Sequence, residues 1–160
     1  MPTKSFIKTA GGIKVFLDPK DRNAILQLGI SVWLNKRGGY PHVTIAGKNF
    51  PLYRLLIKLK GEKVVDHINR NPLDNRRANL RLATKRENSW NGGAHVDNKC
   101  GVRGVCKKGK RFFAYINKNG KQISLGLFPD LRSAATARKK AEKKLYKIFA
   151  PTYASKKTKT

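Results

Sequence analysis

An excess of positive charge constrains this chain more than any other feature. Of its 160 residues, 36 are Lys or Arg and only 9 are Asp or Glu, so the formal net charge at pH 7 is +27. Such a charge opposes compaction through self-repulsion, and highly charged chains are disordered when Leu, Ile, Val and Phe fall below about 20%. Here these four residue types make up a quarter of the chain. We therefore expect small packed cores, in one medium domain or two small ones.

The same charge indicates a polyanionic partner, and nucleic acid is the commonest polyanion. No stretch approaches the roughly 18 apolar residues that cross a bilayer, and the first residues lack the long apolar segment of a secretory signal. The two cysteines, Cys100 and Cys106, are too few for a disulfide framework, and their spacing is not that of a zinc site. These features predict a cytoplasmic protein that has no membrane partner.

Turn-forming residues at 91–94, Asn-Gly-Gly-Ala, divide the chain. Basic residues are denser after this joint than before it, which also favours a boundary here. We therefore expect one domain over residues 1–94, a second over 95–154, and a disordered basic tail over 155–160.

Short apolar runs in the first part predict two strands, a hairpin and a helix, in that order at 13–17, 30–34, 40–45 with 48–50, and 52–59. A strand at 64–67 should then lead through a polar loop to a second strand at 80–83. Thr84 and Glu87 have the spacing of a capping box, so a helix should begin at Lys85. Residues 64–91 thus predict strand, loop, strand and helix in succession.

The second part predicts three strands joined by tight turns, at 101–106, 111–117 and 121–128. A helix should follow from Leu131 to Phe149, with Asp130 as its N-cap. Its small and apolar residues form one stripe, namely Ala134, Ala135, Ala141, Leu145 and Ile148. Alternation along the strands predicts a face toward this helix made of Phe112, Ala114, Ile116, Ile123 and Leu125.

The polar residues of the 64–91 segment suit phosphodiester hydrolysis. That reaction needs a base that activates water and a divalent cation that stabilises charge on the phosphate. His67 is a candidate base because the pKa of histidine lies near neutrality, and Asp66 and Asn88 carry the oxygen ligands that magnesium prefers. Asn79 comes late in the loop, where it could hydrogen-bond the histidine ring or the loop carbonyls.

Residues 65–88 closely resemble the motif of HNH nucleases, in the version found in phage homing endonucleases. The matching segments are Asp66-His67, Leu73-Asp74-Asn75-Arg76 and Asn79-Leu80-Arg81. The resemblance implies a ββα-metal fold that holds one divalent cation, with Mg²⁺ as the preferred ion and Mn²⁺ as the alternative.

The resemblance also implies roles for individual residues. It makes His67 the general base, Asp66 and Asn88 the metal ligands, and Asn79 the residue that orients His67. Where relatives often carry a His-Arg pair before the motif, this chain has Tyr53-Arg54. A phage origin would place the protein in the cytoplasm of a bacterial host.

Residues 99–150 resemble the DNA-binding domain of Apetala-two or ethylene-response-factor type. The resemblance rests on the segments 101–105, 112–116 and 125–128 and on Ala134-Ala135, with Phe112 in place of the usual tryptophan. It implies three strands that lie in the major groove of DNA and are backed by a helix.

Candidate DNA contacts follow from these two resemblances and from strand alternation. Beside the nuclease motif, the candidate phosphate contacts are Arg76, Arg77 and Arg81. On the outward face and turns of the second part, the candidates are Arg103, Lys110, Arg111, Tyr115, Lys118, Lys121 and Gln122.

Together these observations predict an α+β protein with a ββα-metal domain followed by a three-stranded antiparallel sheet and a helix. The expected function is metal-dependent, site-specific cleavage of double-stranded DNA, with nicking of one strand as one form of it, by a monomer without an obligate protein partner. Two other readings are open: a noncatalytic DNA-binding or regulatory protein that keeps the HNH fold, and a structural RNA-binding protein. The set of Asp66, His67, Asn79 and Asn88 favours the nuclease over both.

Overall fold

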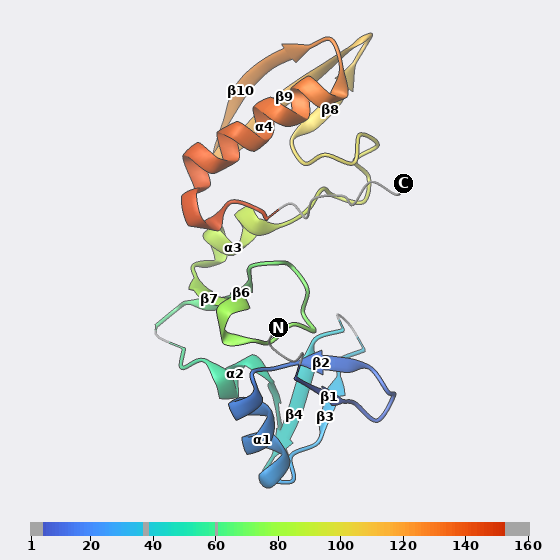
Figure 1. Cartoon of the computed structure of the whole chain (residues 1–160). Helices are drawn as coiled ribbons and strands as arrows, with labels where there is room; N and C mark the ends of the chain where they lie inside the picture. Colours follow the sequence, from blue (N-terminus) through green and yellow to red (C-terminus); the bar gives the residue numbers. More distant parts are fainter. Residues whose placement is uncertain (1–4, 37–38, 60, 153–160) are drawn as a thin grey trace. The chain divides into compact units, whose positions relative to one another are not determined.

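The computed structural model of the chain describes residues 5–36, 39–59 and 61–152. The predicted tail at 155–160 lies outside these residues. The chain forms two compact units, Met1–Asn88 and Ser89–Thr160 (Figure 1). Both mix helices and strands, as expected, and the boundary predicted after residue 94 lies a little inside the second unit. No helix within the described ranges has the length and apolarity needed to span a bilayer.

The first unit is built from a two-stranded hairpin, a helix, a three-stranded sheet, a short helix and a second hairpin. Both hairpins and the sheet are antiparallel. In chain order the elements are β1 (Phe6–Lys8), β2 (Lys14–Phe16), α1 (Pro19–Gln27), β3 (Val32–Leu34), β4 (Pro41–Ile45), β5 (Lys48–Pro51), α2 (Tyr53–Leu56), β6 (Val64–His67), η1 (Arg77–Asn79), β7 (Leu80–Ala83) and α3 (Lys85–Asn91).

The predicted strands and hairpins of this unit are confirmed, but three elements differ from expectation. β1 and α1 were not predicted, because β1 is three residues long and α1 shows little separation of apolar and polar faces. The helix expected over 52–59 is only the single turn α2, since Ile57 already has an extended backbone.

One apolar core joins the elements of the first unit. Val65 of β6 and Leu80 of β7 belong to the same buried cluster as residues from the N-terminal hairpin, α1 and the three-stranded sheet. The cluster consists of Ile7, Val15, Leu17, Ile25, Val32, Val43, Leu52, Leu56, Val65 and Leu80. The β6–β7 hairpin is therefore fixed by burial on its neighbours, because two strands alone are marginal in water.

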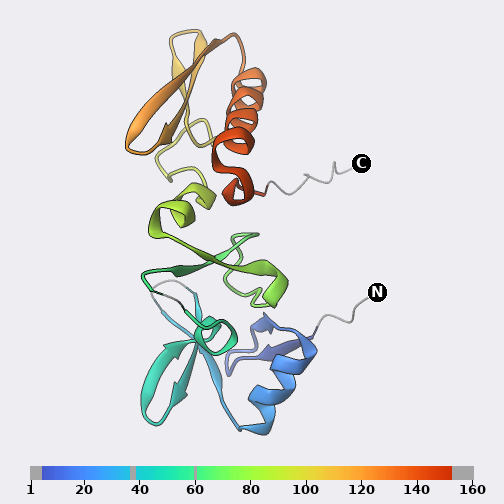
Figure 2. The same ribbon diagram turned by 90° about the vertical axis from the view of Figure 1, so that its left-hand side faces the viewer.

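The second unit is an antiparallel sheet in the order β10–β9–β8 with one long helix packed on it (Figures 1 and 2). Its elements are β8 (Val105–Lys108), β9 (Arg111–Lys118), β10 (Lys121–Phe128), α4 (Leu131–Tyr146) and η2 (Lys147–Phe149). The Asp130 cap is confirmed, because its carboxylate accepts from the backbone N–H of Ser133 at 2.8 Å.

The strand expected at 101–106 begins instead at Val105. Residues 101–104 form a turn, in which Gly104 has a φ of 70° and leaves no room for a side chain. A bulge in β10 between Ser124 and Gly126 also interrupts the expected alternation. Ile123, expected to face the helix, is 40% exposed as a result of its place near the open edge of this two-layer unit.

The buried stripe of α4 differs from the expected one. Ala134 is buried as predicted, but Ile148 is exposed, and the buried residues that follow Ala134 at four-residue spacing are Arg138, Glu142 and Tyr146. Arg138 donates from Nε to Glu142 Oε1 at 2.8 Å and from Nη1 to the carbonyl of Tyr115. An ion pair thus occupies the place where the sequence suggests small apolar residues.

Candidate active site

Two adjacent acidic and basic side chains end strand β6. Asp66 and His67 are only 4% and 6% exposed, and in the register of the hairpin they lie opposite Arg81 and Leu80 of β7. The chain turns directly after His67, where the backbone N–H of Arg70 donates to the His67 carbonyl at 2.8 Å. The strand end therefore holds both side chains in the protein interior at the base of a long loop.

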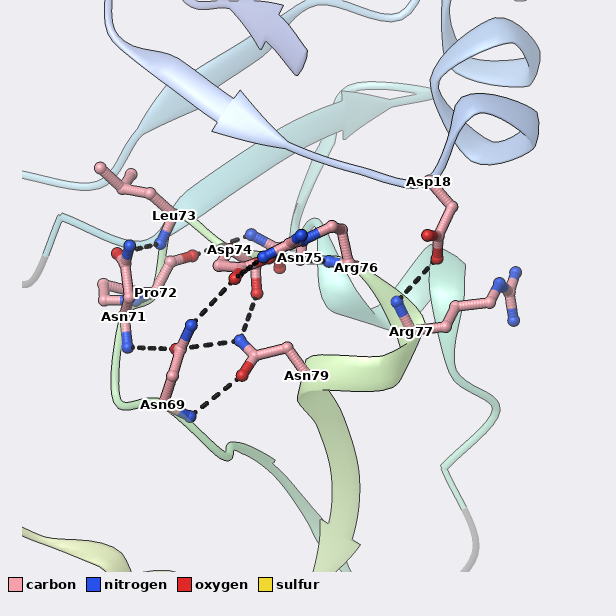
Figure 3. A network of polar contacts seen from close by, with 10 residues as sticks. All are labelled: Asp18, Asn69, Asn71, Pro72, Leu73, Asp74, Asn75, Arg76, Arg77 and Asn79. Atoms are coloured by element: carbon pink, nitrogen blue, oxygen red, sulfur yellow. Dashed lines mark hydrogen bonds and ion pairs between the residues drawn. The ribbon is translucent and has the colours of Figure 1, made fainter. Parts of the chain in front are cut away.

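Asn79 closes that loop with its side-chain amide. Its Oδ1 accepts from the backbone N–H of Asn69 at 3.0 Å, and its Nδ2 donates to the Asn69 Oδ1 at 3.0 Å and to the Asp74 carbonyl at 2.7 Å (Figure 3). Of the two partners expected for Asn79, the structure shows the loop carbonyl. Asn79 is thus placed to hold the loop that follows His67.

The amide of Asn79 can be tested by an isosteric change. Asn79→Asp should lower the free energy of unfolding by about 1–3 kcal/mol or more. The carboxylate oxygen that replaces Nδ2 cannot donate, and it would face two hydrogen-bond acceptors, the Asn69 Oδ1 and the Asp74 carbonyl. Urea unfolding followed by circular dichroism measures this loss. The matched control is Asn71→Asp. The exposed Asn71 side chain accepts a hydrogen bond from the Leu73 N–H at 3.0 Å, and a carboxylate can accept the same bond. Equal stability of the two variants would contradict the loop-closing role of Asn79.

Asn75 is the residue that faces the histidine ring, a role that the sequence reading missed. Its Oδ1 lies 3.4 Å from His67 Nε2, and its Nδ2 donates to the Pro72 carbonyl at 2.8 Å. Because Nδ2 is engaged as a donor, Oδ1 is the acceptor, which favours the His67 tautomer with its proton on Nε2. That tautomer carries its basic lone pair on Nδ1. Asn75 is fully buried, and this is the one property that separates it from an ordinary turn asparagine.

Burial lowers the pKa of His67, while the Asn75 contact and the charges of Asp66 and Asp74 act in the opposite direction. The net effect keeps the imidazole neutral near pH 7. A neutral imidazole is the form that can accept a proton. Two tyrosine rings also flank it, with centroids 6.0 Å away for Tyr40 and 6.3 Å for Tyr53. Tyr53 is therefore close to His67, in the position where relatives often have histidine.

The three arginines expected to contact phosphate beside the motif all bind carboxylates. Arg76 and Arg77 form bidentate pairs with Asp74 and Asp21, with donor–acceptor distances of 2.6 to 2.9 Å. Arg76 holds the pKa of the buried Asp74 carboxyl below its usual range. Arg81 donates from Nε to Asp66 Oδ2 at 2.7 Å and is largely buried. These pairs shape the loop and the Asp66 carboxylate, and phosphate contacts by the same arginines stay a prediction.

The N-terminal part of the chain also holds the loop. Phe16 of β2 donates its N–H to the Leu73 carbonyl at 2.8 Å and accepts from the Asn75 N–H at 2.8 Å. The Asp18 carboxylate accepts from the backbone N–H of Arg77 at 2.8 Å (Figure 3). These contacts join residues nearly sixty positions apart, so no local sequence signal marks them.

The donor set suits a hard cation with few protein ligands. No group of three His, Cys, Asp or Glu that could hold a metal ion occurs in the described part of the chain. Asp66 offers a buried carboxylate, and Asn88 lies on α3 with an exposed side chain. One carboxylate and one amide oxygen fit magnesium, which keeps several waters and is completed by substrate phosphates. The capping box that begins α3 is present, with Thr84 and Glu87 bonded reciprocally.

The candidate DNA contacts of the second unit fall into two groups. Four lie on the outer face or in a turn of the sheet as expected: Lys110, Arg111, Tyr115 and Gln122. Among them Tyr115 stacks on Phe113, with ring centroids 5.9 Å apart. The other three lie elsewhere. In the register of the sheet Lys121 is opposite Lys118, on the side that faces α4. Lys118 donates to the Leu145 carbonyl at 3.1 Å.

Arg103 differs most from its expected position. It lies in the turn before β8, and its Nη1 is 2.5 to 3.2 Å from the carbonyls of Ser89, Trp90 and Gly92. It holds the segment that leads from α3 into the sheet, and a DNA contact by Arg103 stays a prediction.

Comparison with known proteins agrees with this site. Residues 58–90 match the family model described as HNH endonuclease. An uncharacterized HNH endonuclease of Acanthamoeba polyphaga mimivirus is 33% identical over 123 residues, which cover 74% of this chain and 64% of that relative. The chain thus spans less than two thirds of the relative's length. No solved structure gives a significant match.

These matches support an HNH nuclease domain. The matched residues 58–90 include the Asp-His pair at the end of β6, the loop closed by Asn79, and α3. The predicted HNH motif is therefore confirmed over this segment. The resemblance of the second unit to Apetala-two domains stays a prediction.

Proposed function

We propose that this chain is a metal-dependent, site-specific endonuclease of HNH type that hydrolyses phosphodiester bonds in double-stranded DNA. The observation that carries the proposal is a buried His67 that faces Asn75 and stands beside the Asp66 carboxylate, inside a segment that matches HNH endonucleases. A homing role and cleavage of one strand per encounter belong to the same proposal.

In this mechanism His67 is the general base. Its Nδ1 takes a proton from water, and the water oxygen forms a bond to phosphorus. The bond from phosphorus to the leaving ester oxygen breaks, and that oxygen keeps the electron pair and is protonated by a solvent water. Asn75 holds the ring tautomer, and Asn79 holds the loop that carries Asn75. Asp66 and Asn88 would hold one divalent cation, which supplies charge stabilisation to the phosphate when bound.

The sheet of the second unit is the proposed DNA-binding surface. Its outer face presents the Phe113–Tyr115 pair between Arg111 at the start of β9 and Gln122 near the start of β10. Arginine and glutamine can read base edges, while Lys110 in the β8–β9 turn and the exposed Lys108, opposite Arg111 in the register, suit phosphate. Two DNA-contacting units on one chain raise the effective concentration of each for the same duplex.

The function is tested by incubating the purified chain with supercoiled plasmid, either with magnesium or with EDTA. Relaxed circles that form only with magnesium are the expected product, and their persistence without linear plasmid would indicate nicking. Because the target site is unknown, a pool of random duplex fragments is treated in parallel and sequenced at its new ends. Intact DNA in both assays, from protein that binds duplex, would contradict the nuclease proposal and favour a noncatalytic binding protein.

The sheet surface is tested by its contribution to the salt dependence of binding. The double variant Lys108→Gln/Lys110→Gln should reduce the slope of log affinity against log salt by about two, since each phosphate contact contributes roughly 0.9. Gel-shift titrations in EDTA measure this slope. The control is Lys20→Gln/Lys48→Gln, which removes the same charge from exposed positions of the first unit. Equal slopes for the two variants would place the DNA elsewhere.

A further inference from the structure

The outward face of α4 carries a row of basic side chains that the proposed function does not use. Because Ala134, Arg138, Glu142 and Tyr146 are buried, the opposite face of the helix points away from the sheet. At three- and four-residue spacing along that face lie Arg132, Thr136, Lys139, Lys140 and Lys143, followed by Lys147 just after the helix, and all six are exposed. From Arg132 to Lys143 the row is about 16 Å long at 1.5 Å per residue.

Two acidic side chains accompany this row in the described residues of α4 and its cap, and both are hydrogen-bonded within the unit. Asp130, the N-cap, accepts from Ser133 and also attracts Arg132. The one acidic residue of α4 is Glu142, which is 1% exposed and bonded to Arg138. Lysines four apart, such as Lys140 and Lys144, repel one another and destabilise a helix by a few tenths of a kcal/mol per pair. The helix therefore carries a cost that an external anion would remove.

The surface is also hollowed along the row. Two hollows, of about 560 and 370 Å³, share Thr136 and Lys140. The larger is lined further by Lys139, Lys143 and Lys147, together with the bonded Glu142 and the mainly apolar segment that follows the helix, and the smaller by Arg132 and Phe128. Several cations around adjoining hollows fit a ligand that carries repeated negative charge along its length.

We infer that this α4 surface binds the phosphate backbone of a second segment of duplex DNA, separate from the segment on the sheet. Duplex DNA carries one charge per about 1.7 Å of axis, so a row of this length meets several phosphates. In Figure 2 the sheet and α4 form two layers of the second unit, so their outer faces point in opposite directions. One straight duplex cannot lie on both faces. The inference rests on the proposed function only in taking duplex DNA as the ligand of the sheet.

The test uses the full chain in EDTA, so that cleavage plays no part. In the first assay, one short duplex is fixed to beads, and capture of a second, fluorescently labelled duplex of random sequence is measured. In the second assay, sedimentation velocity on free protein and duplex measures how many duplexes each chain holds. We expect one wild-type chain to hold two duplexes. Lys139→Gln/Lys140→Gln/Lys143→Gln should lose the second duplex, capture no labelled DNA on the beads, and reduce the salt slope by about two to three.

Folding is controlled within the same experiment. Glutamine has nearly the helix propensity of lysine, so the triple variant should melt at or above the wild-type temperature. The matched control is Lys20→Gln/Lys48→Gln/Lys58→Gln, which removes equal charge from exposed positions of the first unit and should retain both duplexes.

Four results would overturn the inference. The first is a wild-type chain that holds only one duplex, and the second is a triple variant that bridges DNA like the wild type. The third is a control variant that loses the second duplex to the same extent. The fourth is an α4 surface that captures anionic phosphatidylserine vesicles but no second duplex. A wild-type chain that cleaves no DNA yet holds two duplexes would contradict the nuclease proposal and support this one.

Discussion

Replacement of His67 by alanine should lower the rate of magnesium-dependent plasmid cleavage by about 10²–10⁴-fold, the range that a general base contributes. Affinity for duplex DNA should be unchanged, because His67 is buried and the proposed binding residues lie on the second unit. Cleavage is measured by the conversion of supercoiled to relaxed plasmid, and affinity by gel shift in EDTA.

Two controls make the His67 result specific. His95→Ala removes an exposed histidine, whose side chain is 80% exposed, and should cleave at the wild-type rate. His67→Gln retains a polar side chain near Asn75 and should fold like the wild type while remaining inactive. A His67→Ala protein that cleaves at the wild-type rate would show that another group activates water.

Asp66→Asn should lower cleavage by about 10³-fold, because cation binding contributes several kcal/mol and each 1.4 kcal/mol is about tenfold in rate. The variant should also lose the rise in melting temperature that magnesium gives the wild type, since ligands that bind only the folded state stabilise it. This thermal shift is measured without DNA, so it reports the cation site independently of cleavage.

The Asp66 carboxylate also bonds Arg81, so the variant weakens a buried ion pair as well as the proposed cation site. Arg81→Met separates the two effects. Both variants should lose about 1.5–3 kcal/mol of unfolding free energy, the value of a hydrogen bond to a charged group. Only Arg81→Met should keep the magnesium-induced thermal shift. If Asp66→Asn retains that shift, Asp66 does not bind the cation.

Local signals in the sequence were sufficient to predict the order of the strands and the helix around the site. The strand at 64–67, the strand at 80–83 and the helix from Lys85 were all predicted, because alternation and the capping box are encoded within a few residues. The Asp130 cap and the turn at Asn119-Gly120 were predictable for the same reason.

Features that depend on distant contacts were not predictable in this way. Asn75 has the composition of a turn residue, and only its complete burial against Phe16 and His67 shows its role. The Arg138–Glu142 pair breaks the apolar stripe of α4, because its charges are satisfied by each other and by the Tyr115 carbonyl rather than by water. A pattern of hydrophobicity cannot distinguish such a buried pair from a solvated one.

The attachment of the loop to β2 and α1 has a consequence for modularity. The segment that matches HNH endonucleases covers residues 58–90, but Val65 and Leu80 within it complete a core whose other members precede it. Phe16, Asp18 and Asp21 supply backbone and side-chain partners for Leu73, Asn75 and Arg77. The transferable structural unit is therefore longer than the matched segment, and a graft of residues 58–90 into another protein would carry Asp66, His67 and Asn75 without the scaffold that orients them.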